Sequence, residues 1–441
     1  LLGAALDTLT GKADGAPASV AVFNGMNYRR SGVVSISVSG GPNKVLDSDG
    51  REAPSQTVTG KDGTEILFLA EDVPATGWKT YRLEAASPAD VDTGLRAGST
   101  FLENQFVRVE IAGDGTFSRV YDKANAREVL APGVNGNVLQ AFVDTPGKWE
   151  AWEIARDFEA NGEDLRGPVE MELVESGPVR ARIRTTRRWS KSTFVQDITL
   201  TADSPRVDVV THVDWQDRQR LLKVLFPVNV KSDVATYEVP YSAIERSTRN
   251  ETTFEQAQFE VPALQWADMS ADGFGVALMN DCKHGYDIKG NRMRLTLLRS
   301  PNSPDPNCDK GEHTFTYSLY PHAGDRREGQ IYRAATDLND PLFARACSHM
   351  SGDTASIVEI GPDNVLLSAM KLADDGDGVI VRFFETDDRD GEALLTFGAS
   401  VSAAWETDML EHNEKALTPN GNTLRVPLGH NEVKTLRVRF A

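Results

Sequence analysis

The sequence predicts an all-β protein of several domains. The chain has 441 residues, which is too long for one ordinary core and indicates two to four domains. Apolar and polar residues alternate in many segments, as where Val34, Ile36 and Val38 are separated by serines. Turns rich in Gly and Asp separate these segments, and helical periodicity is rare. We therefore expect large, packed antiparallel sheets.

The predicted strands form three groups along the chain. A small sandwich is expected after a Gly/Pro/Ala linker at residues 12–17. Long alternating stretches at residues 179–184, 194–200 and 207–213 predict a large central sandwich. A last small sandwich begins at about Gly352, and its final strand, at residues 433–440, ends the chain. Helix is expected only at residues 1–12 and 343–350.

Composition excludes some partners. The net charge is −18, from 47 basic and 65 acidic residues, and such a surface repels phosphate backbones and anionic lipid. No apolar run approaches the roughly 20 residues that cross a bilayer. Nucleic acid and membrane are therefore not expected as partners, whereas a neutral sugar is compatible with this charge. The first residues lack an initiator Met and do not form a signal peptide, so we expect a fragment of a longer protein.

Three cysteines, Cys282, Cys308 and Cys347, have no CxxC spacing, and their odd number gives no closed disulfide framework. This usage fits a reducing compartment, so the predicted location is cytoplasmic.

Common catalytic and metal motifs are absent. There is no Walker loop, HExxH, GxSxG or GxGxxG, and the seven His are not spaced as metal ligands. Residues 47–50 and 374–378 resemble pieces of a calcium loop but lack the downstream Glu, so we interpret them as hairpin turns.

Three clusters could still carry chemistry. The first holds Trp149, Glu150, Trp152 and Glu153 within five residues. Sugar sites use aromatic faces for the C–H side of a ring and carboxylates for its hydroxyls. A tryptophan-anchored loop packed on a sheet explains the same residues, and the sequence alone leaves both interpretations open.

The second cluster, at residues 279–286, is dense in donors and ends in Tyr286, but a polar turn between strands is the favoured interpretation. The third contains Arg299 at a predicted strand end, followed by prolines and Asp305. An Arg held by rigid flanks can clamp a hydroxyl, or pair with a carboxylate for structure.

These clusters resemble the C-terminal portion of glycoside hydrolase family 38 α-mannosidases, in the cytosolic and vacuolar-type branch. The matching stretches run in family order along nearly the whole chain: VFNGMNYRRSGVV from Val22, LENQFVRV from Leu102, DTPGKWEAWE from Asp144, VDW from Val213, LLKVLFPV from Leu221, YEVPY from Tyr237, LMNDCKHGY from Leu278, LLRSP from Leu297 and LRVRF from Leu436. Glu150 and Glu153 stand where the family more often shows Asp.

The resemblance implies a large galactose-mutarotase-like antiparallel supersandwich flanked by two smaller β-sandwich domains. Expected boundaries are 1–17 for the remnant of a helical bundle with its linker, 18–98 for a small sandwich, 99–335 for the supersandwich and 336–441 for the last sandwich. The family's barrel and bundle would precede this chain.

The resemblance also implies retaining hydrolysis of terminal α-mannosides by a zinc enzyme. Nucleophile, acid/base and zinc ligands match no residue here, so no catalytic residue, metal ligand or cofactor is expected in this chain. Supersandwich loops are expected to rim the sugar site. The expected rim residues are Trp149, Glu150, Trp152, Glu153 and Arg299, with Tyr286 and Asp305 as supports for Arg299. A structural role is expected for Lys283 and His284.

Expected partners are a mannose-containing oligosaccharide and the protein's own barrel and bundle, while self-association into a homo-oligomer stays open. One alternative is a stand-alone carbohydrate-binding module. Another is a mutarotase or epimerase, which needs a His and a carboxylate in one pocket; His212 and His313 are the candidates, without a paired signal.

Overall fold

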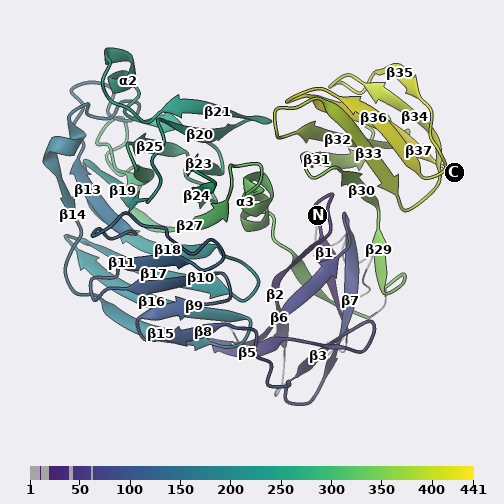
Figure 1. The fold of residues 1–441 in the computed structure, drawn as a ribbon, viewed down its shortest axis with the longest axis horizontal. Helices are drawn as coiled ribbons and strands as arrows, with labels where there is room; N and C mark the ends of the chain where they lie inside the picture. The colour runs from purple at the N-terminus through teal and green to yellow at the C-terminus, as the bar shows by residue number, and fades with distance from the viewer. Residues whose placement is uncertain (1–9, 11–18, 39–42, 61–62, 349) are drawn as a thin grey trace. The chain divides into compact units, whose positions relative to one another are not determined.

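The computed structural model of the protein describes residues 10, 19–38, 43–60, 63–348 and 350–441 (Figure 1). The chain divides into two compact units. One comprises residues 1–91, 240–242 and 340–441, and the other comprises residues 92–239 and 243–339. The second unit is called the central unit below. No helix in the described ranges is both long and apolar enough to cross a membrane.

The central unit consists of antiparallel sheets (Figure 1). The largest has nine strands in the order β15 (Glu170–Ser176), β16 (Arg180–Trp189), β17 (Ser192–Thr201), β18 (Val207–Trp215), β27 (Gly311–Ala323), β24 (Phe274–Asn280), β23 (Trp266–Ala271), β20 (Val234–Val239) and β21 (Ser242–Ser247). A six-stranded sheet has the order β14 (Gly162–Asp164), β13 (Val138–Val143), β19 (Arg220–Pro227), β26 (Arg292–Arg299), β25 (Gly285–Lys289) and β22 (Val261–Pro262). A five-stranded sheet has the order β12 (Arg127–Glu128), β11 (Phe117–Asp122), β10 (Val107–Ile111), β9 (Phe101–Glu103) and β8 (Arg96–Gly98).

One hydrophobic core joins these three sheets. Val109 of β10, Leu139 of β13, Ile198 of β17 and Leu295 of β26 all belong to it and are almost completely buried. Because residues two apart point to the same face of a strand, each sheet places an apolar row in this core. The predicted large antiparallel supersandwich is therefore confirmed.

Strand β16 shows the same alternation, with its arginines on the face that points away from the core. Ala181 and Ile183 are completely buried in the core. Arg184 lies on the opposite face, where its Nε donates to Asp197 Oδ1 at 2.7 Å. The period-two pattern predicted this strand and its two faces.

Helices are short in the described ranges. The central unit has the 3-10 helix η1 (Phe158–Asn161), α2 (Thr253–Ala257) and α3 (Ile331–Asn339). α2 begins with a capping box, in which the Thr252 hydroxyl accepts from the Glu255 N–H and the Glu255 carboxylate accepts from the Thr252 N–H. Helix α3 was not predicted from the sequence.

The other unit contains two small sandwiches. The first pairs a sheet of β28 (Phe343–Cys347), β1 (Ser19–Asn24), β7 (Gly77–Glu84), β3 (Lys44–Asp47) and β4 (Glu52–Ala53), with β29 (Thr354–Ser356) beside β7, against a sheet of β2 (Arg30–Val38), β6 (Gly63–Val73) and β5 (Ser55–Gly60). Its core contains Val20, Val34 and Phe68.

The second sandwich is formed by the C-terminal residues. One sheet has β30 (Val358–Gly361), β33 (Gly391–Phe397) and β36 (Thr423–Leu428), and the other has β31 (Val365–Leu372), β32 (Val379–Glu385), β37 (Val433–Phe440), β34 (Val401–Thr407) and β35 (Asn413–Leu417). Their apolar faces share a core around Phe383, Leu395 and Leu436.

The helix predicted at residues 343–350 was wrong. Phe343–Cys347 is not helical but is the edge strand β28, which pairs antiparallel with β1 so that Val20 faces Ala346. β29 likewise pairs with β7 of the first sandwich. β28 and β29 therefore complete the first sandwich, and β30 is the first strand along the chain that belongs to the last sandwich. The predicted helix at residues 1–12 lies, except for Thr10, outside the described residues.

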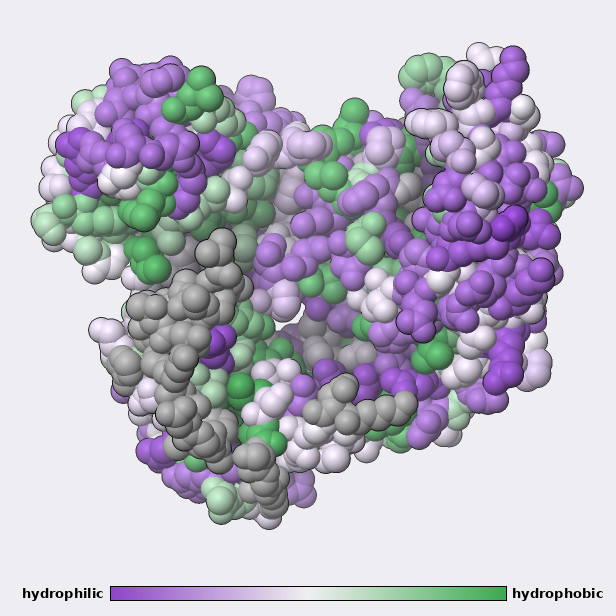
Figure 2. Space-filling model, turned by 180° about the vertical axis from the view of Figure 1, so that it is seen from behind, coloured by the Kyte–Doolittle hydropathy of each residue, from purple (hydrophilic) through white to green (hydrophobic). Residues whose placement is uncertain are grey.

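Large apolar side chains are exposed at several places on the described surface. Phe254, Leu372 and Leu410 are each more than 70% exposed. Figure 2 shows apolar patches among mainly hydrophilic side chains on the face it displays. The described surface is therefore not uniformly polar.

A buried carboxyl group links the fold of the central unit to pH. Glu238 on β20 is buried, and one of its carboxylate oxygens accepts the Gln265 N–H at 2.6 Å. Burial disfavours the charged form and raises the pKa of Glu238 from 4.5 to about 7. The folded chain therefore binds a proton between about pH 4.5 and 7 that the unfolded chain releases. The stability that Glu238 contributes to the folded chain is fully present below pH 4.5 and is lost as the pH rises through 7.

We predict that Glu238→Gln, which cannot ionise, becomes progressively more stable than the parent chain between pH 4.5 and 8. The relative gain should be on the order of 2–3 kcal/mol, because one pKa unit corresponds to about 1.4 kcal/mol. Urea unfolding at a series of pH values measures it. Parallel pH profiles for the two proteins would contradict the buried, protonated state.

Candidate functional site

The loop between β13 and η1 presents two tryptophans to solvent. Trp149 and Trp152 are 69% and 70% exposed, and their rings meet edge to face, with centroids 6.2 Å apart and planes at 85°. All seven tryptophans of the chain lie in the described ranges, and the other five are buried or half-buried. Residues 149–153 are called the Trp loop below.

A tight turn shapes the Trp loop. The Trp149 carbonyl accepts the N–H groups of Trp152 at 2.7 Å and of Glu153 at 2.8 Å. Trp149 itself has a φ of 57°, in the left-handed region that residues other than Gly seldom adopt. Such a conformation persists only where surrounding contacts hold it.

Arg299, the last residue of β26, supplies those contacts. Its Nε donates to Asp144 Oδ2 at 2.5 Å. Its Nη2 donates to the carbonyl oxygen of Glu150 at 2.6 Å and also to that of Glu153, while Nη1 reaches the Ala151 carbonyl at 3.5 Å. The planar fork of the guanidinium thus binds the main chain of the loop, and most of its donors are occupied.

Asp144 completes this arrangement from the start of the loop. Its side chain is 2% exposed, and its second oxygen accepts the Ala155 N–H at 3.0 Å. One buried carboxylate therefore binds both Arg299 and the far end of the loop. Removing either member of this buried ion pair would leave the other charge without its partner.

The two loop glutamates differ in their surroundings. Glu150 Oε2 accepts the Asn302 N–H at 2.7 Å, and Oε1 lies 3.4 Å from Gln219 Nε2. The Glu153 side chain is exposed, and no contact is described for its carboxylate. Glu150 therefore helps to fix the loop, whereas the Glu153 carboxylate is open to solvent.

The segment after the Trp loop is held on the outer face of the six-stranded sheet. Phe158 of η1 packs edge to face on Phe142, at a centroid distance of 5.0 Å. Glu159 of η1 forms an ion pair with Arg294, which also lies 2.5 Å from Asp287 Oδ2. The segment from Asp144 to the end of η1 is called the covering segment below. Arg294 and Arg299, both on β26, therefore bind the covering segment at two points.

The ion pair of Arg294 belongs to a buried charge network that was not predicted from the sequence. Lys223 of β19 is completely buried and pairs with Glu260, whose other oxygen accepts the Thr296 hydroxyl. Burial raises the pKa of the Asp287 carboxyl in this network, although Lys223 and Arg294 act against the shift. The sequence does contain one signal for this network, because Lys223 is a charged residue between apolar neighbours in its strand.

Tyr286 does not support Arg299. It is completely buried in the core, where its hydroxyl accepts from Asn280 Nδ2 at 2.7 Å and donates to the Leu278 carbonyl at 3.1 Å. A side chain at this depth cannot rim a surface site.

Asp305 does not reach Arg299 either. It is exposed, and its Oδ1 accepts the Asn307 N–H at 2.8 Å within its own turn. The prolines that flank it make a compact turn, which explains the residue without a ligand.

The donor-rich cluster at residues 279–286 contains the turn that joins β24 to β25. Asn280 Oδ1 accepts the Lys283 N–H at 2.6 Å, and the Lys283 ammonium lies 4.5 Å from the centre of the Phe315 ring. His284 Nδ1 lies 3.2 Å from the Ala263 carbonyl. Burial and the Asp281 carboxylate raise the pKa of Cys282 to about 11, so this thiol is protonated at neutral pH.

The two candidate histidines do not share a pocket. His212 is exposed on β18 and contacts Thr314 Oγ1 at 2.9 Å. His313 faces Val213 in the strand pairing and contacts the Asp309 carbonyl at 2.8 Å. Directly paired residues point to the same side of a sheet and neighbours alternate, so these imidazoles lie on opposite faces.

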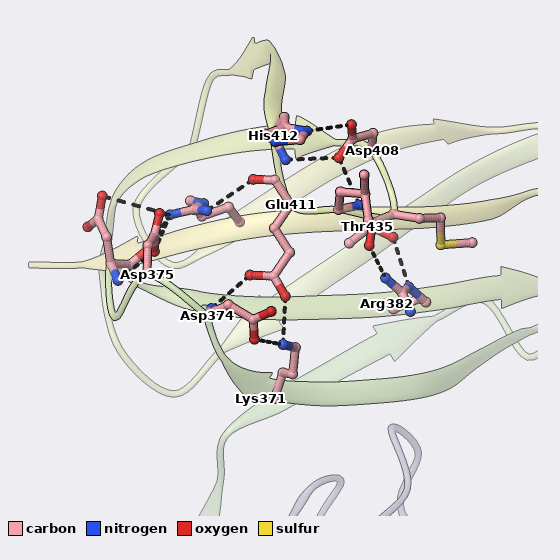
Figure 3. A network of polar contacts seen from close by, with 12 residues as sticks. Lys371, Asp374, Asp375, Arg382, Asp408, Glu411, His412 and Thr435 are labelled. Carbon is pink, nitrogen blue, oxygen red and sulfur yellow. Dashed lines mark hydrogen bonds and ion pairs between the residues drawn. The ribbon is translucent and has the colours of Figure 1, made fainter.

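The acidic stretch at residues 374–378 forms a hairpin turn. Figure 3 shows Lys371 between Asp374 and Glu411, and the Lys371 Nζ lies 2.6 Å from Glu411 Oε1. Arg437 Nη1 donates to both carboxylate oxygens of Asp375, at 2.8 and 2.7 Å. Cations of the protein neutralise these carboxylates. Within the described ranges, no group of three or more His, Cys, Asp or Glu is placed to hold a metal ion.

The comparisons with known proteins agree with this geometry. Residues 102–307 match the glycosyl hydrolases family 38 C-terminal domain, and residues 364–436 match the glycosyl hydrolases family 38 C-terminal beta sandwich domain. The chain belongs to the C-terminal region of glycosyl hydrolase family 38. The Trp loop and Arg299 both lie in the first matched range.

Curated relatives support the family, and a solved structure shares the fold. Alpha-mannosidase 2C1 of Homo sapiens is 32% identical over 77% of this chain, and alpha-mannosidase G of Dictyostelium discoideum is 34% identical over 87%. An alpha-mannosidase crystal structure from Enterococcus faecalis shares the fold, with a TM-score of 0.81 at 16% identity over 99% of this chain and 58% of its own. The family 38 chain spans only 33% and 36% of the two curated relatives.

We predict that Asp144→Ala destabilises the central unit of this family 38 chain by about 3 kcal/mol, because it leaves the Arg299 charge and the Ala155 N–H without their acceptor. The freed loop should also become more mobile around Lys148, which is already exposed, so trypsin should cleave there faster. Urea unfolding and timed proteolysis measure the two effects.

Asp92→Ala is the matched control for this change. Asp92 pairs with Arg96 at 2.8 Å on the surface, and exposed pairs contribute little. Equal stability losses for Asp92→Ala and Asp144→Ala would show that the buried pair has no special role.

Proposed function

We propose that this chain is the non-catalytic β portion of a retaining, zinc-dependent α-mannosidase that hydrolyses terminal α-D-mannosides of oligosaccharides. The observation that carries the proposal is the ordered match to both family 38 C-terminal domains in a chain related to α-mannosidases. The nucleophile, the acid/base and the zinc ligands belong to the rest of the protein, whose own domains are the main partner of this chain.

The carboxylates around the Trp loop support a non-catalytic role. Retaining hydrolysis needs a carboxylate nucleophile and a second carboxyl group about 5 Å away, both free to reach the sugar. Asp144 is bound to Arg299, and Glu150 accepts the Asn302 N–H. These groups hold the loop and are not available as a nucleophile and an acid.

A zinc ion needs three or four converging N, S or O ligands. The described residues offer no such group and do not fit zinc, so the metal would be held by residues outside the described ranges. The loop residues Trp149, Trp152 and Glu153 then contribute to the wall of the substrate site.

A cytoplasmic location is part of the proposal. Cys282, Cys308 and Cys347 are all free, and Cys282 is exposed. Exposed free thiols are usual in reducing compartments and rare in oxidising ones.

We predict that the full-length protein releases the chromophore from p-nitrophenyl α-mannoside, that chelation of zinc abolishes the reaction, and that the 441-residue chain alone is inactive with or without zinc. Initial rates of all four samples, measured at equal molar concentration, test this prediction. Zinc-dependent turnover by the 441-residue chain alone would overturn the proposal.

The exposed tryptophan pair favours a second candidate function, a stand-alone carbohydrate-binding module. Calorimetric titration of the isolated chain with mannose oligosaccharides separates the two. The α-mannosidase proposal expects no heat at micromolar concentrations, whereas a self-sufficient module would show saturable binding there that Trp152→Ala removes.

A further inference from the structure

We propose that Trp149 and Trp152 form a subsite for the sugar on the leaving-group side of the scissile bond, and that Arg299 is the positioning residue that keeps this subsite in shape. The inference rests on the proposed α-mannosidase function and goes beyond it, because it states which part of the substrate the Trp loop binds.

The indole rings of Trp149 and Trp152 form an L-shaped aromatic surface, which is called the corner below. Their planes are nearly perpendicular, at 85°, and both rings are about 70% exposed. A pyranose presents its C–H face to one indole while its rim lies beside the other, and the open Glu153 carboxylate can accept a hydroxyl at the edge.

The corner is ordered before any ligand arrives. The Arg299 guanidinium binds the carbonyl oxygens of Glu150 and Glu153, and the two N–H bonds to the Trp149 carbonyl close the turn. Because the loop has already lost its conformational freedom, stacking energy goes into binding rather than into ordering the chain.

The leaving-group side follows from what the loop lacks. The terminal mannose must be held by the groups that attack it, and the Trp loop offers no such pair, because the carboxylates of Asp144 and Glu150 already bind Arg299 and the Asn302 N–H. Stacking reads a ring face rather than a set of hydroxyls, so it suits sugars beyond the terminal one, whose linkages vary.

A packing anchor for the catalytic domain is the competing explanation of two exposed tryptophans. An anchor would stabilise the whole enzyme and would affect all substrates alike. A leaving-group subsite affects only substrates that have a sugar there. The two explanations therefore differ in substrate dependence.

The test compares two substrates of the full-length protein. α-Mannosyl fluoride has a single atom as its leaving group, whereas an α-linked mannotriose has a disaccharide. Trp149→Ala and Trp152→Ala should each lower kcat/KM for mannotriose about tenfold, mainly through KM, and should change kcat/KM for mannosyl fluoride less than about twofold. Phe254→Ala, which removes a 72% exposed aromatic from α2, should change neither.

Arg299→Lys tests the positioning role. Lysine keeps a positive charge near Asp144 but cannot form a fork to the loop carbonyls, so the same selective loss on mannotriose is expected. Adding Trp152→Ala to Arg299→Lys should cause little further loss, because the corner is already disordered. Arg292→Lys, on the same strand with a half-exposed side chain, is the control and should behave like the parent.

Equal losses on both substrates, or no loss on mannotriose, would overturn this inference while the proposed function stands. Failure of the unmodified full-length protein to cleave mannosyl fluoride would overturn the proposed function and this inference with it. Full additivity of Arg299→Lys and Trp152→Ala would remove the positioning role of Arg299.

Discussion

The ion pair between Arg299 and Asp144 is the interaction on which the candidate site depends. Asp144 lies at the start of the covering segment and Arg299 at the end of β26, so a contact across 155 residues fixes where the loop leaves the sheet. Both side chains are largely buried, and desolvating two charges is repaid only when their remaining hydrogen-bonding groups also find partners. The loop carbonyls and the Ala155 N–H supply those partners, which makes the loop geometry and the ion pair mutually dependent.

Much of the fold could be predicted from the sequence because sheets have a simple period. The alternation around Ala181 and Ile183 predicted both faces of β16, and similar patterns predicted three β-rich groups. Phe343–Cys347 was mistaken for a helix because a five-residue segment has no clear period. Its strand character comes from pairing with β1, more than 300 residues earlier, and such a tertiary contact leaves no local signal.

The candidate site was predictable in part for the same reason. Two tryptophans and two glutamates in five residues identified the Trp loop, and Arg299 was singled out because its strand ends at prolines. The sequence could not indicate that Arg299 binds carbonyl groups, since every residue has one. Nor could it show that Tyr286 is buried while Trp149 and Trp152 are exposed, because burial of an aromatic ring depends on which strands pack over it.

The way Arg299 holds the loop has a consequence for how the protein can evolve. The guanidinium recognises main-chain oxygens of Glu150, Ala151 and Glu153, and these oxygens remain when the side chains mutate. Substitutions at the solvent-facing positions can therefore accumulate without altering the backbone path. One arginine and one aspartate thus preserve a scaffold on which natural variation can sample new recognition surfaces, and a laboratory library confined to positions 151 and 153 should retain folded members at high frequency.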